Sequence, residues 1–269
     1  MVEPESFLRF LYAPIQPGVK FTDNFISYQE FLPHPDLQEL IYCYWQLQTK
    51  VVLAQPFNYR VVTDGCIDIF FEVDSPAKTF IMGFCKSYTS FELPQTFNYF
   101  GIRFLPTKFP LFFGVNASTL TDNYKSLHIA APNIAKFIAE NVKPKNELNS
   151  QFDQYFCSLL GNFKPKDDQR LGKAIAKILK SNGNLQVDKD LDVGISIRQL
   201  RRLFEFYIGT TPKTFSKVVR FQHVLRINED LNKNRLTDLF LSTGYFDQAH
   251  FIKEFKKMYG LTPNQALRK

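Results

Sequence analysis

A stretch of 17 residues near the end of the chain occurs twice, and this repeat constrains the fold more than any other feature. Residues 196–212, SIRQLRRLFEFYIGTTP, are followed 51 residues later by DQAHFIKEFKKMYGLTP, residues 247–263. Each copy has a residue suited to cap a helix, an apolar stripe, basic residues between the apolar ones, and a glycine that stops the helix. The repeat therefore predicts two equivalent helices, each followed by a helix that begins at a proline.

The first copy separates into an apolar and a basic face. Its apolar stripe has the i, i+3, i+4, i+7 spacing: Leu200, Leu203, Phe204 and Tyr207. A second set has the same spacing two positions away, about 200° around the helix, and so faces away from the core. This set is Arg198, Arg201, Arg202 and Glu205. The planar fork of arginine fits the O6 and N7 atoms of guanine in the major groove, so this face is a candidate for reading DNA.

The second copy divides in the same way. Its core stripe is Phe251, Phe255, Met258 and Tyr259, and its outward face is expected to hold Gln248, Ala249, Ile252, Lys253 and Lys256. Gln can hydrogen-bond to adenine, and Ala and Ile can contact the methyl group of thymine. An exposed Ile252 would not be stabilised by contact with water, so a contact with DNA would explain an apolar residue at this position. The alternative is a solvated basic face on a helical bundle. A bundle, however, has no need to duplicate cap, stop and basic face together.

Charge is unevenly distributed along the chain. The whole sequence carries 33 Lys and Arg against 26 Asp and Glu, a net charge of +7. Residues 164–269 hold 21 of the basic and 11 of the acidic residues, whereas residues 1–163 have a net charge of −3. Such an asymmetry indicates a polyanionic partner for the C-terminal part, although a solvated basic surface is common.

Several classes of protein are disfavoured. No apolar run approaches the ~20 residues of a membrane span, and the acidic start, MVEPESFLRF, does not resemble a secretory signal. The four cysteines are far apart, which favours reduced thiols in a cytoplasmic protein over a zinc site. They are Cys43, Cys66, Cys85 and Cys157. We expect no metal, no cofactor and no catalytic site.

Residues ~5–115 have the pattern of short strands separated by Gly, Pro, Asn and Asp. The strand-like runs are Leu40–Leu47, Tyr59–Thr63, Ile67–Val73, Thr79–Phe84 and Phe97–Phe104. Many short strands at such spacing predict an antiparallel β-barrel or sandwich.

From about Thr119 the pattern becomes helical, and Gly161–Pro165 has the composition of a linker. We therefore predict an α+β chain of two domains, residues 1–163 with a β-barrel followed by helices and residues 164–269 entirely helical. The helices expected in the second domain are Leu171–Leu179, Val187–Val193, one between Ser196 and Gly209, Pro212–Asn232, Asn234–Thr243, Asp247–Tyr259 and Pro263–Arg268. Their short connections suit helix-turn-helix units.

The repeated segments and their flanks resemble the AraC/XylS family of bacterial transcription regulators. The matching text is ISIRQLRRLF, GTTPKTF, Arg220 and GYFDQAHFIKEFKKMYGLTP, and it covers about residues 168–269. The resemblance implies two helix-turn-helix units joined by the long helix Thr214–Asn232, with reading helices in successive major-groove turns. It places base-contacting positions on Arg198, Arg201 and Arg202, then on Gln248, Ala249, Ile252 and Lys253; Lys256 lies on the same predicted face.

Two positions depart from the pattern of this family. The family usually has a small Ala four residues before the glycine of each unit, where this chain has Asp190 and Phe240. Asp190 is unfavourable for the second helix of the first unit. Phe240 requires a different packing of the fifth helix against the sixth.

The N-terminal part resembles the regulatory domain of one AraC subgroup in the pieces LQELIYCYWQL, RVVTDGCIDIFF and FGIRFLP. This resemblance implies a cupin-like β-barrel. A metal-dependent cupin enzyme is disfavoured because His34 and His128 are its only histidines and neither lies in an expected strand. A cysteine-based DNA-repair methyl acceptor needs a zinc-bound thiolate cluster, which this cysteine spacing does not provide.

A pocket for a small-molecule effector is the remaining hypothesis for this part. Trp45, Asp68 and Arg103 lie in the family-like pieces and are candidates to line it, with an Asp68–Arg103 ion pair between neighbouring strands as one arrangement. The alternatives are structural: aromatic strand residues often fill a core, Asp64 and Gly65 suit a tight turn, and Cys66 suits a core position.

We therefore predict a sequence-specific DNA-binding transcription regulator, not an enzyme, that is modulated by its N-terminal domain. The expected partner is double-stranded DNA, with RNA polymerase, a small-molecule effector and a second copy of the chain as further candidates. The alternative is a small-molecule-binding protein or cupin-type enzyme whose basic helices contact a protein partner.

Overall fold

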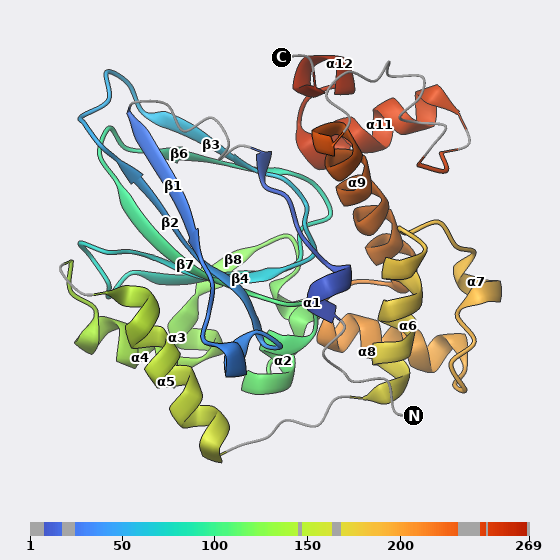
Figure 1. Cartoon of the computed structure of the whole chain (residues 1–269), viewed down its shortest axis with the longest axis horizontal. Helices are drawn as coiled ribbons and strands as arrows, with labels where there is room; N and C mark the ends of the chain where they lie inside the picture. Colours follow the sequence, from blue (N-terminus) through green and yellow to red (C-terminus); the bar gives the residue numbers. More distant parts are fainter. Residues whose placement is uncertain are drawn as a thin grey trace.

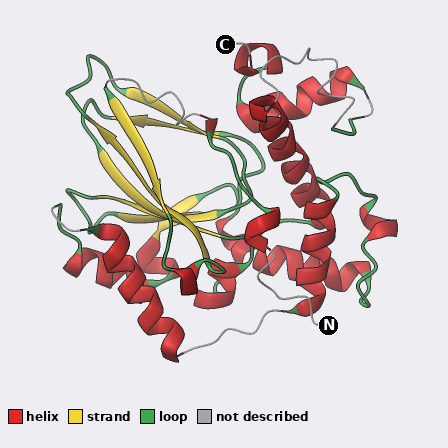
Figure 2. Cartoon of the chain, viewed as in Figure 1, coloured by secondary structure: helices red, strands yellow, loops and turns green. Residues whose placement is uncertain are grey.

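The computed structural model describes residues 8–17, 25–144, 147–162, 168–230, 243–245 and 247–267. Strands and the helices that cover them make up the N-terminal part, and the C-terminal part is helical (Figures 1 and 2). This arrangement confirms the α+β class and the expected order of its parts. The predicted boundary after residue 163 falls outside the described residues and stays a prediction.

Eight described strands form two antiparallel sheets. Six strands pair in the order β1-β2-β7-β4-β5-β8, and the other two pair as β3-β6, which we call the β3–β6 ribbon. The bounds are β1 Ile26–Phe31, β2 Ile41–Thr49, β3 Phe57–Val61, β4 Ile67–Glu72, β5 Thr79–Met82, β6 Thr89–Leu93, β7 Asn98–Phe104 and β8 Tyr124–Ser126. Within the described residues, no strand of the ribbon pairs with a strand of the large sheet. The expected antiparallel domain is therefore present as two sheets, without a closed ladder of backbone hydrogen bonds.

The two faces of the large sheet pack against different partners. Along β4, Ile67, Ile69 and Phe71 point to one face and join a core with the helices, which lie below the sheet in Figure 1. The intervening Asp68 and Phe70 point to the other face, toward the ribbon, as the alternation of a strand requires. The helices of this part are α1 Leu8–Leu11, η3 Pro35–Leu37, α2 Lys108–Phe113, η4 Ala117–Leu120, α3 Leu127–Ala130, α4 Pro132–Asn141 and α5 Leu148–Asn162.

The C-terminal part consists of short helices around one long helix. The bounds are α6 Gln169–Lys180, α7 Val187–Asp190, α8 Ile197–Tyr207, α9 Pro212–Asp230, α11 Gln248–Tyr259 and α12 Pro263–Leu267. All the expected helices that fall within the described residues are present. The predicted helix Asn234–Thr243, including Phe240, lies outside the described residues except for Thr243. Within the described residues, no helix combines the length and the apolar character needed to cross a bilayer.

Helix α7 is shorter than the sequence predicts, and Asp190 accounts for its form. The sequence predicts a helix over Val187–Val193, whereas the helix ends at Asp190. The Asp190 carboxylate accepts a hydrogen bond of 2.6 Å from the backbone N–H of Gln186, at the start of the helix. Lys177 of α6 donates to the carbonyl oxygen of Asp190 at 3.1 Å. The acidic residue therefore stabilises a single helical turn, where the family usually has a small residue.

The two parts of the chain share one hydrophobic core. The core of the C-terminal helices includes Phe204 of α8, Phe215 of α9 and Phe255 of α11. Five buried side chains from the N-terminal part complete it: Tyr12, Val62, Cys66, Phe84 and Leu105. We call these five residues the seam, because through them the helical part packs directly against the β-sheet part.

Candidate nucleic-acid interface and ligand cavity

The sequence repeat is also a structural repeat. Ser196 caps α8, with its hydroxyl accepting from the backbone N–H of Gln199 at 3.2 Å and the Gln199 side chain accepting from the backbone N–H of Ser196 at 3.1 Å. Asp247 caps α11 by accepting from the backbone N–H of His250 at 2.7 Å. Both helices end at a glycine with positive φ, +92° at Gly209 and +91° at Gly260, which only glycine adopts without strain. Each helix therefore begins at a side-chain cap and is stopped by a left-handed glycine, and we call α8 and α11 the reading helices.

The basic face predicted for α8 is exposed. Leu200 and Phe204 are completely buried against α9 and α6, which fixes the rotation of the helix. Arg198, Arg201 and Arg202 are exposed on the opposite side. Their side chains are thus free to reach a groove while the apolar stripe holds the helix in place.

The corresponding face of α11 is exposed at four of its five predicted positions. Gln248, Ala249, Lys253 and Lys256 are exposed. Ile252 differs, since it is half-buried and packs against the shared core. Packing against the core therefore explains why this residue is apolar, whereas the sequence predicted a fully exposed position.

Glu254 is a buried charge in α11 that the sequence interpretation missed. It is 7% exposed and accepts a hydrogen bond from Lys217 of α9, while His250 Nε2 lies 3.5 Å from its carboxylate. The sequence does contain a signal for this residue, because Glu254 is an acidic residue next to the apolar stripe of an otherwise basic helix. The Lys217–Glu254 pair fixes α11 on α9.

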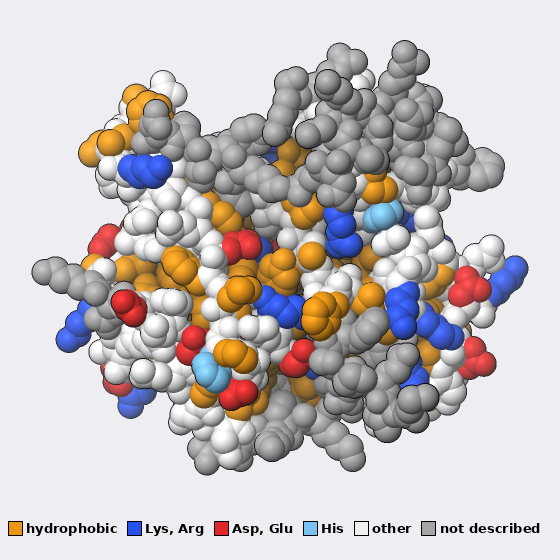
Figure 3. All heavy atoms as spheres, viewed as in Figure 1, with side chains coloured by type: hydrophobic (Ala, Val, Ile, Leu, Met, Phe, Trp, Pro, Cys, Tyr) orange, Lys and Arg blue, Asp and Glu red, His pale blue; other side chains and the backbone are white. Residues whose placement is uncertain are grey.

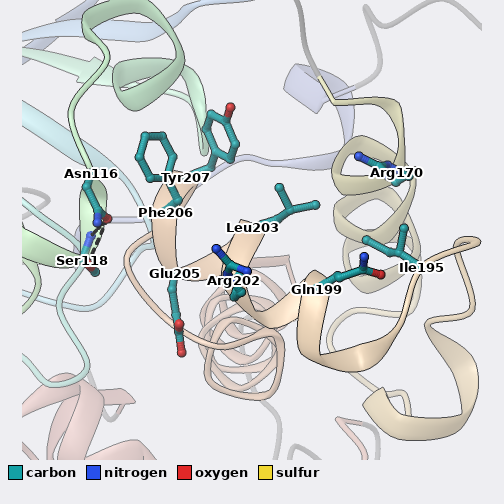
Figure 4. Close-up of a pocket in the computed structure, with 10 residues that line it drawn as sticks. All are labelled: Asn116, Ser118, Arg170, Ile195, Gln199, Arg202, Leu203, Glu205, Phe206 and Tyr207. Atoms are coloured by element: carbon teal, nitrogen blue, oxygen red, sulfur yellow. Dashed lines mark hydrogen bonds between the residues drawn. The ribbon is translucent and has the colours of Figure 1, made fainter.

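The reading helices lie at opposite ends of α9 (Figure 1). Groups of Lys and Arg side chains appear over the C-terminal helices, at the right of Figure 3. A groove of about 600 Å³ runs beside α8, between η4 of the N-terminal part and the start of α6 (Figure 4). Its lining includes Arg202 and Phe206 of α8, Asn116 and Ser118 at the start of η4, and Arg170 of α6. Arg198 and Arg201 lie outside this lining, so η4 flanks the basic face without covering it.

The three residues predicted to line an effector pocket come together in the N-terminal part. Trp45, Asp68 and Arg103 all line a cavity of about 440 Å³ between the large sheet and the β3–β6 ribbon. Most of the remaining lining is aromatic or aliphatic and comes from both sheets. These residues are Leu47, Tyr59, Val61, Phe70, Phe80, Met82, Phe91, Leu93, Tyr99 and Tyr124.

The polar centre of this cavity is an ion pair. Arg103 Nη2 donates to Asp68 Oδ2 at 3.0 Å, and Arg103 Nε lies 3.2 Å from both carboxylate oxygens. The indole N–H of Trp45 donates to the same Oδ2 at 3.0 Å. Burial raises the pKa of Asp68 to about 6, while the Arg103 guanidinium acts in the opposite direction. The Asp68–Arg103 pair suggested by the sequence is thus present, and Trp45 belongs to it.

Two further carboxylates surround the same guanidinium. Asp64 Oδ2 lies 3.6 Å from Arg103 Nε, and Glu30 Oε1 lies 3.7 Å from Arg103 Nη1. Arg103 is 2% exposed, and its Nη1 atom has no hydrogen-bond partner among the residues that the structure describes. The site therefore combines an excess of negative charge with one buried donor that lacks an acceptor.

Asp64 and Gly65 form the expected tight turn, and Cys66 occupies the expected core position. Asp64 Oδ1 accepts from the backbone N–H of Cys66 at 2.9 Å, and Gly65 has a φ of +76° in the turn between them. Cys66 is buried in the seam. Asp64 thus forms the turn and also contributes its second carboxylate oxygen to the surroundings of Arg103.

Two separate stretches of the chain match known domain families. Residues 192–269 match a family described as a helix-turn-helix domain. Residues 29–126 match a family described as a domain of unknown function, DUF6597. The first match contains both reading helices, and the second contains the cavity.

Several regulators are similar to the chain over part of their length. The HTH-type transcriptional regulator MtrA of Neisseria gonorrhoeae is 30% identical over 109 residues, which are 40% of this chain and 36% of MtrA. The XylDLEGF operon transcriptional activator 1 of Pseudomonas putida is 29% identical over 103 residues, 38% of this chain and 31% of the activator. The chain thus spans about a third of the length of these relatives. Among solved structures, ToxT from Vibrio cholerae O395 aligns with a TM-score of 0.44 and 8% identity, over 91% of this chain and 98% of ToxT.

Proposed function

We propose that this chain is a sequence-specific DNA-binding transcription regulator of the AraC/XylS type, because residues 192–269 match a helix-turn-helix domain. In this proposal α8 and α11 enter two successive major-groove turns on one face of the duplex. Arg198, Arg201 and Arg202 contact one block of bases. Gln248, Ala249, Ile252 and Lys253 contact the other, and Lys256 contacts the flanking phosphate.

One observation carries this proposal. Two helices, each with a side-chain cap at its start and a glycine stop at its end, present exposed basic faces from the two ends of α9. One exposed basic helix is an ordinary feature of a protein surface. Two matched ones, in a part of the chain with most of the basic residues, suit a polyanion with a repeating groove.

Selection of bound sequences from random duplex DNA tests the proposal. The full chain should be used at about 0.15 M salt, where non-specific binding through phosphates is weakened. The expected result is a motif of two blocks about one helical turn apart. No enriched motif, with or without the cavity ligands considered below, would contradict the function.

Single substitutions then assign each reading helix to its block. Arg202→Ala and Lys253→Ala should each cost about 1–3 kcal/mol and relax base preference in one block only. Lys136→Ala is a matched control, because this exposed lysine lies on α4 in the N-terminal part. Loss of affinity without any loss of base preference would reassign these residues to phosphate contacts.

We further propose that the cavity beside Trp45 binds an uncharged effector with an apolar body and one acceptor oxygen. Arg103 Nη1 supplies a buried donor with no partner in the described part of the chain, and such a donor is costly to leave unsatisfied. A carboxylate placed there would face Asp64, Asp68 and Glu30, whereas a cation would face the guanidinium. A ketone or similar carbonyl avoids both repulsions and leaves the aromatic walls to its apolar part.

Three molecules of the same shape test this ligand class: 4-phenylbutan-2-one, 3-phenylpropanoate and 3-phenylpropylammonium. Trp45 is the only tryptophan in the chain, so its fluorescence reports directly on the cavity. We expect the ketone to give saturable binding at roughly millimolar concentration, as for fragments of this size, and to raise the melting temperature. Tighter binding of either charged molecule, or saturable binding of none, would contradict the proposal.

The remaining partner predictions belong to the same proposal. A regulator of this type acts in the bacterial cytoplasm, where it meets DNA and RNA polymerase. A second copy of the chain is a further candidate partner, and the number of chains bound to the selected DNA tests it.

A further inference from the structure

The C-terminal end of reading helix α11 is completed by the N-terminal part of the chain. The last carbonyl oxygens of a helix have no donors within the helix. The backbone N–H of Gly260 satisfies Lys256, but the next two carbonyls bond outside the C-terminal part. Tyr88 N–H donates to the oxygen of Lys257 at 3.2 Å, and Thr63 N–H donates to the oxygen of Met258 at 3.3 Å.

Both of these donors lie at one end of the β3–β6 ribbon. Val61 and Thr89 are the last paired residues of the ribbon at this end. Thr63 comes two residues after Val61, and Tyr88 comes directly before Thr89. The ribbon therefore reaches α11 through both of its strands.

Side chains strengthen this joint. The ring of Tyr88 lies against Gly260, where an added Cβ would come within 2.9 Å of the ring. The guanidinium of Arg60, on β3, lies 5.8 Å from the centre of the same ring. Gln222 of α9 donates to the carbonyl oxygen of Thr63 at 2.7 Å. The end of the ribbon, α9 and α11 thus form one connected unit.

Reading helix α8 is joined to a different element. The hydroxyl of Thr121 donates to the carbonyl oxygen of Gly209 at 2.6 Å, just after α8 ends. Thr121 follows η4, and the next residue, Asp122, donates its backbone N–H to Phe84 at 2.9 Å. Phe84 lies two residues after the end of β5 of the large sheet. The first reading helix is therefore joined to the large sheet, and the second to the ribbon.

The cavity lies between these two sheets, and no strand pairing in the described residues joins them. Residues on both strands of the ribbon line it, including Val61 and Thr89 at the joint itself. An occupant that changes the separation of ribbon and sheet need not break a backbone ladder. It would, however, displace Thr63 and Tyr88, and with them the end of α11.

We infer that the β3–β6 ribbon is a spacing element, which sets the position of α11 relative to α8 according to what fills the cavity. The inference rests on the proposed DNA-binding function and adds a regulated property to it: the preferred distance between the two DNA blocks. Tyr88 is then a positioning residue for the second reading helix, although it lies outside the helix-turn-helix domain.

The test uses the full chain and DNA in which the two selected blocks are moved apart or together by one or two base pairs. The unaltered protein should prefer one spacing by roughly ten- to a hundredfold, because simultaneous binding fails at the others. Tyr88→Ala should reduce this preference to within about threefold while leaving base preference in each block unchanged. Tyr88→Leu, which keeps apolar cover over Gly260, should retain most of it.

Filling the cavity tests the other half of the inference. Met82 lines the cavity from β5, and Met82→Trp should move the optimal spacing, whereas Met82→Trp combined with Tyr88→Ala should not. Thr121→Val should relax the spacing preference from the α8 side, with Thr119→Val as its matched control in η4. The inference is overturned if folded Tyr88→Ala and Thr121→Val keep the spacing preference of the unaltered protein. Failure of the unaltered protein to select two blocks would instead count against the proposed function.

Discussion

The indole ring of Trp45 lies directly over Gly101, its partner on the neighbouring strand β7. Any Cβ at Gly101 would collide with the ring, so the glycine is what allows the indole to lie flat on the sheet and reach Asp68. A glycine within a strand often marks such a close approach. Here it shapes the floor of the cavity.

Gly101→Ala should therefore displace the indole and break the Trp45–Asp68 hydrogen bond. We expect a loss of roughly 1–3 kcal/mol in the free energy of unfolding, the usual range for overpacking a core. Urea unfolding and the emission of the single tryptophan measure the two effects, and we expect emission at longer wavelength as the indole becomes hydrated. An unchanged emission spectrum would show that the ring tolerates a methyl group beneath it.

The matched caps of the reading helices provide a second prediction. Ser196→Ala and Asp247→Ala should each lower the free energy of unfolding by about 1 kcal/mol, because each removes the acceptor of an otherwise unpaired backbone donor. Thermal and urea unfolding give the values. Ser196→Asp and Asp247→Ser keep an acceptor in place and should restore most of the loss, and if they do not, the caps are not the source of the effect.

Stability should depend on pH through Asp68. Its pKa is about 6 in the folded protein, compared with about 3.9 for an unfolded chain. Between these values the folded state binds more protons than the unfolded chain. The contribution of Asp68 to the free energy of unfolding therefore falls as the pH rises from about 4 to about 6, by about 2–3 kcal/mol, and is constant above that range.

Asp68→Asn removes this dependence. As the pH rises from 4 to 7, the unaltered protein should lose about 2–3 kcal/mol of stability through Asp68, and the variant should not. The variant should therefore become more stable relative to the unaltered protein by this amount. Urea unfolding at several pH values, followed by circular dichroism, measures the difference. Asp74→Asn, in an exposed turn, is the control, and parallel curves for both variants would contradict the assignment to Asp68.

The salt dependence of DNA binding separates phosphate contacts from base contacts. Lys256 lies on the exposed face of α11, and Lys256→Ala should weaken binding to selected and random DNA alike. It should also reduce the slope of log affinity against log salt concentration by about 1, since one fewer counterion is released. Arg202→Ala should instead affect selected DNA more than random DNA. Equal behaviour of the two variants would mean that one of these roles is misassigned.

Periodicity predicted the helical part well because its signals are local. The stripe of Leu200 and Phe204, the cap at Ser196 and the stop at Gly209 all lie within one short segment, and each has its expected role. Asp190 shows where such a pattern fails. Its carboxylate bonds to Gln186 and shortens α7, a contact that a comparison with a family pattern does not contain.

The cavity was predictable only as a set of candidate residues. Trp45, Asp68 and Arg103 come from three different strands, and strand order decides whether they meet. The strands β1, β6 and β8 were absent from the predicted runs, and β6 forms half of the ribbon that closes the cavity. The joint between Tyr88 and α11 had no sequence signal, because backbone N–H groups make its hydrogen bonds.

The seam has a consequence for how proteins of this build diversify. Exchange of the helical part between two such chains would require a cut between the two parts. Here such a cut would leave Tyr12, Val62, Cys66, Phe84 and Leu105 facing a foreign surface. A functional hybrid must inherit matching residues on both sides, so the β-sheet part and the reading helices are expected to change together, as an inherited pair.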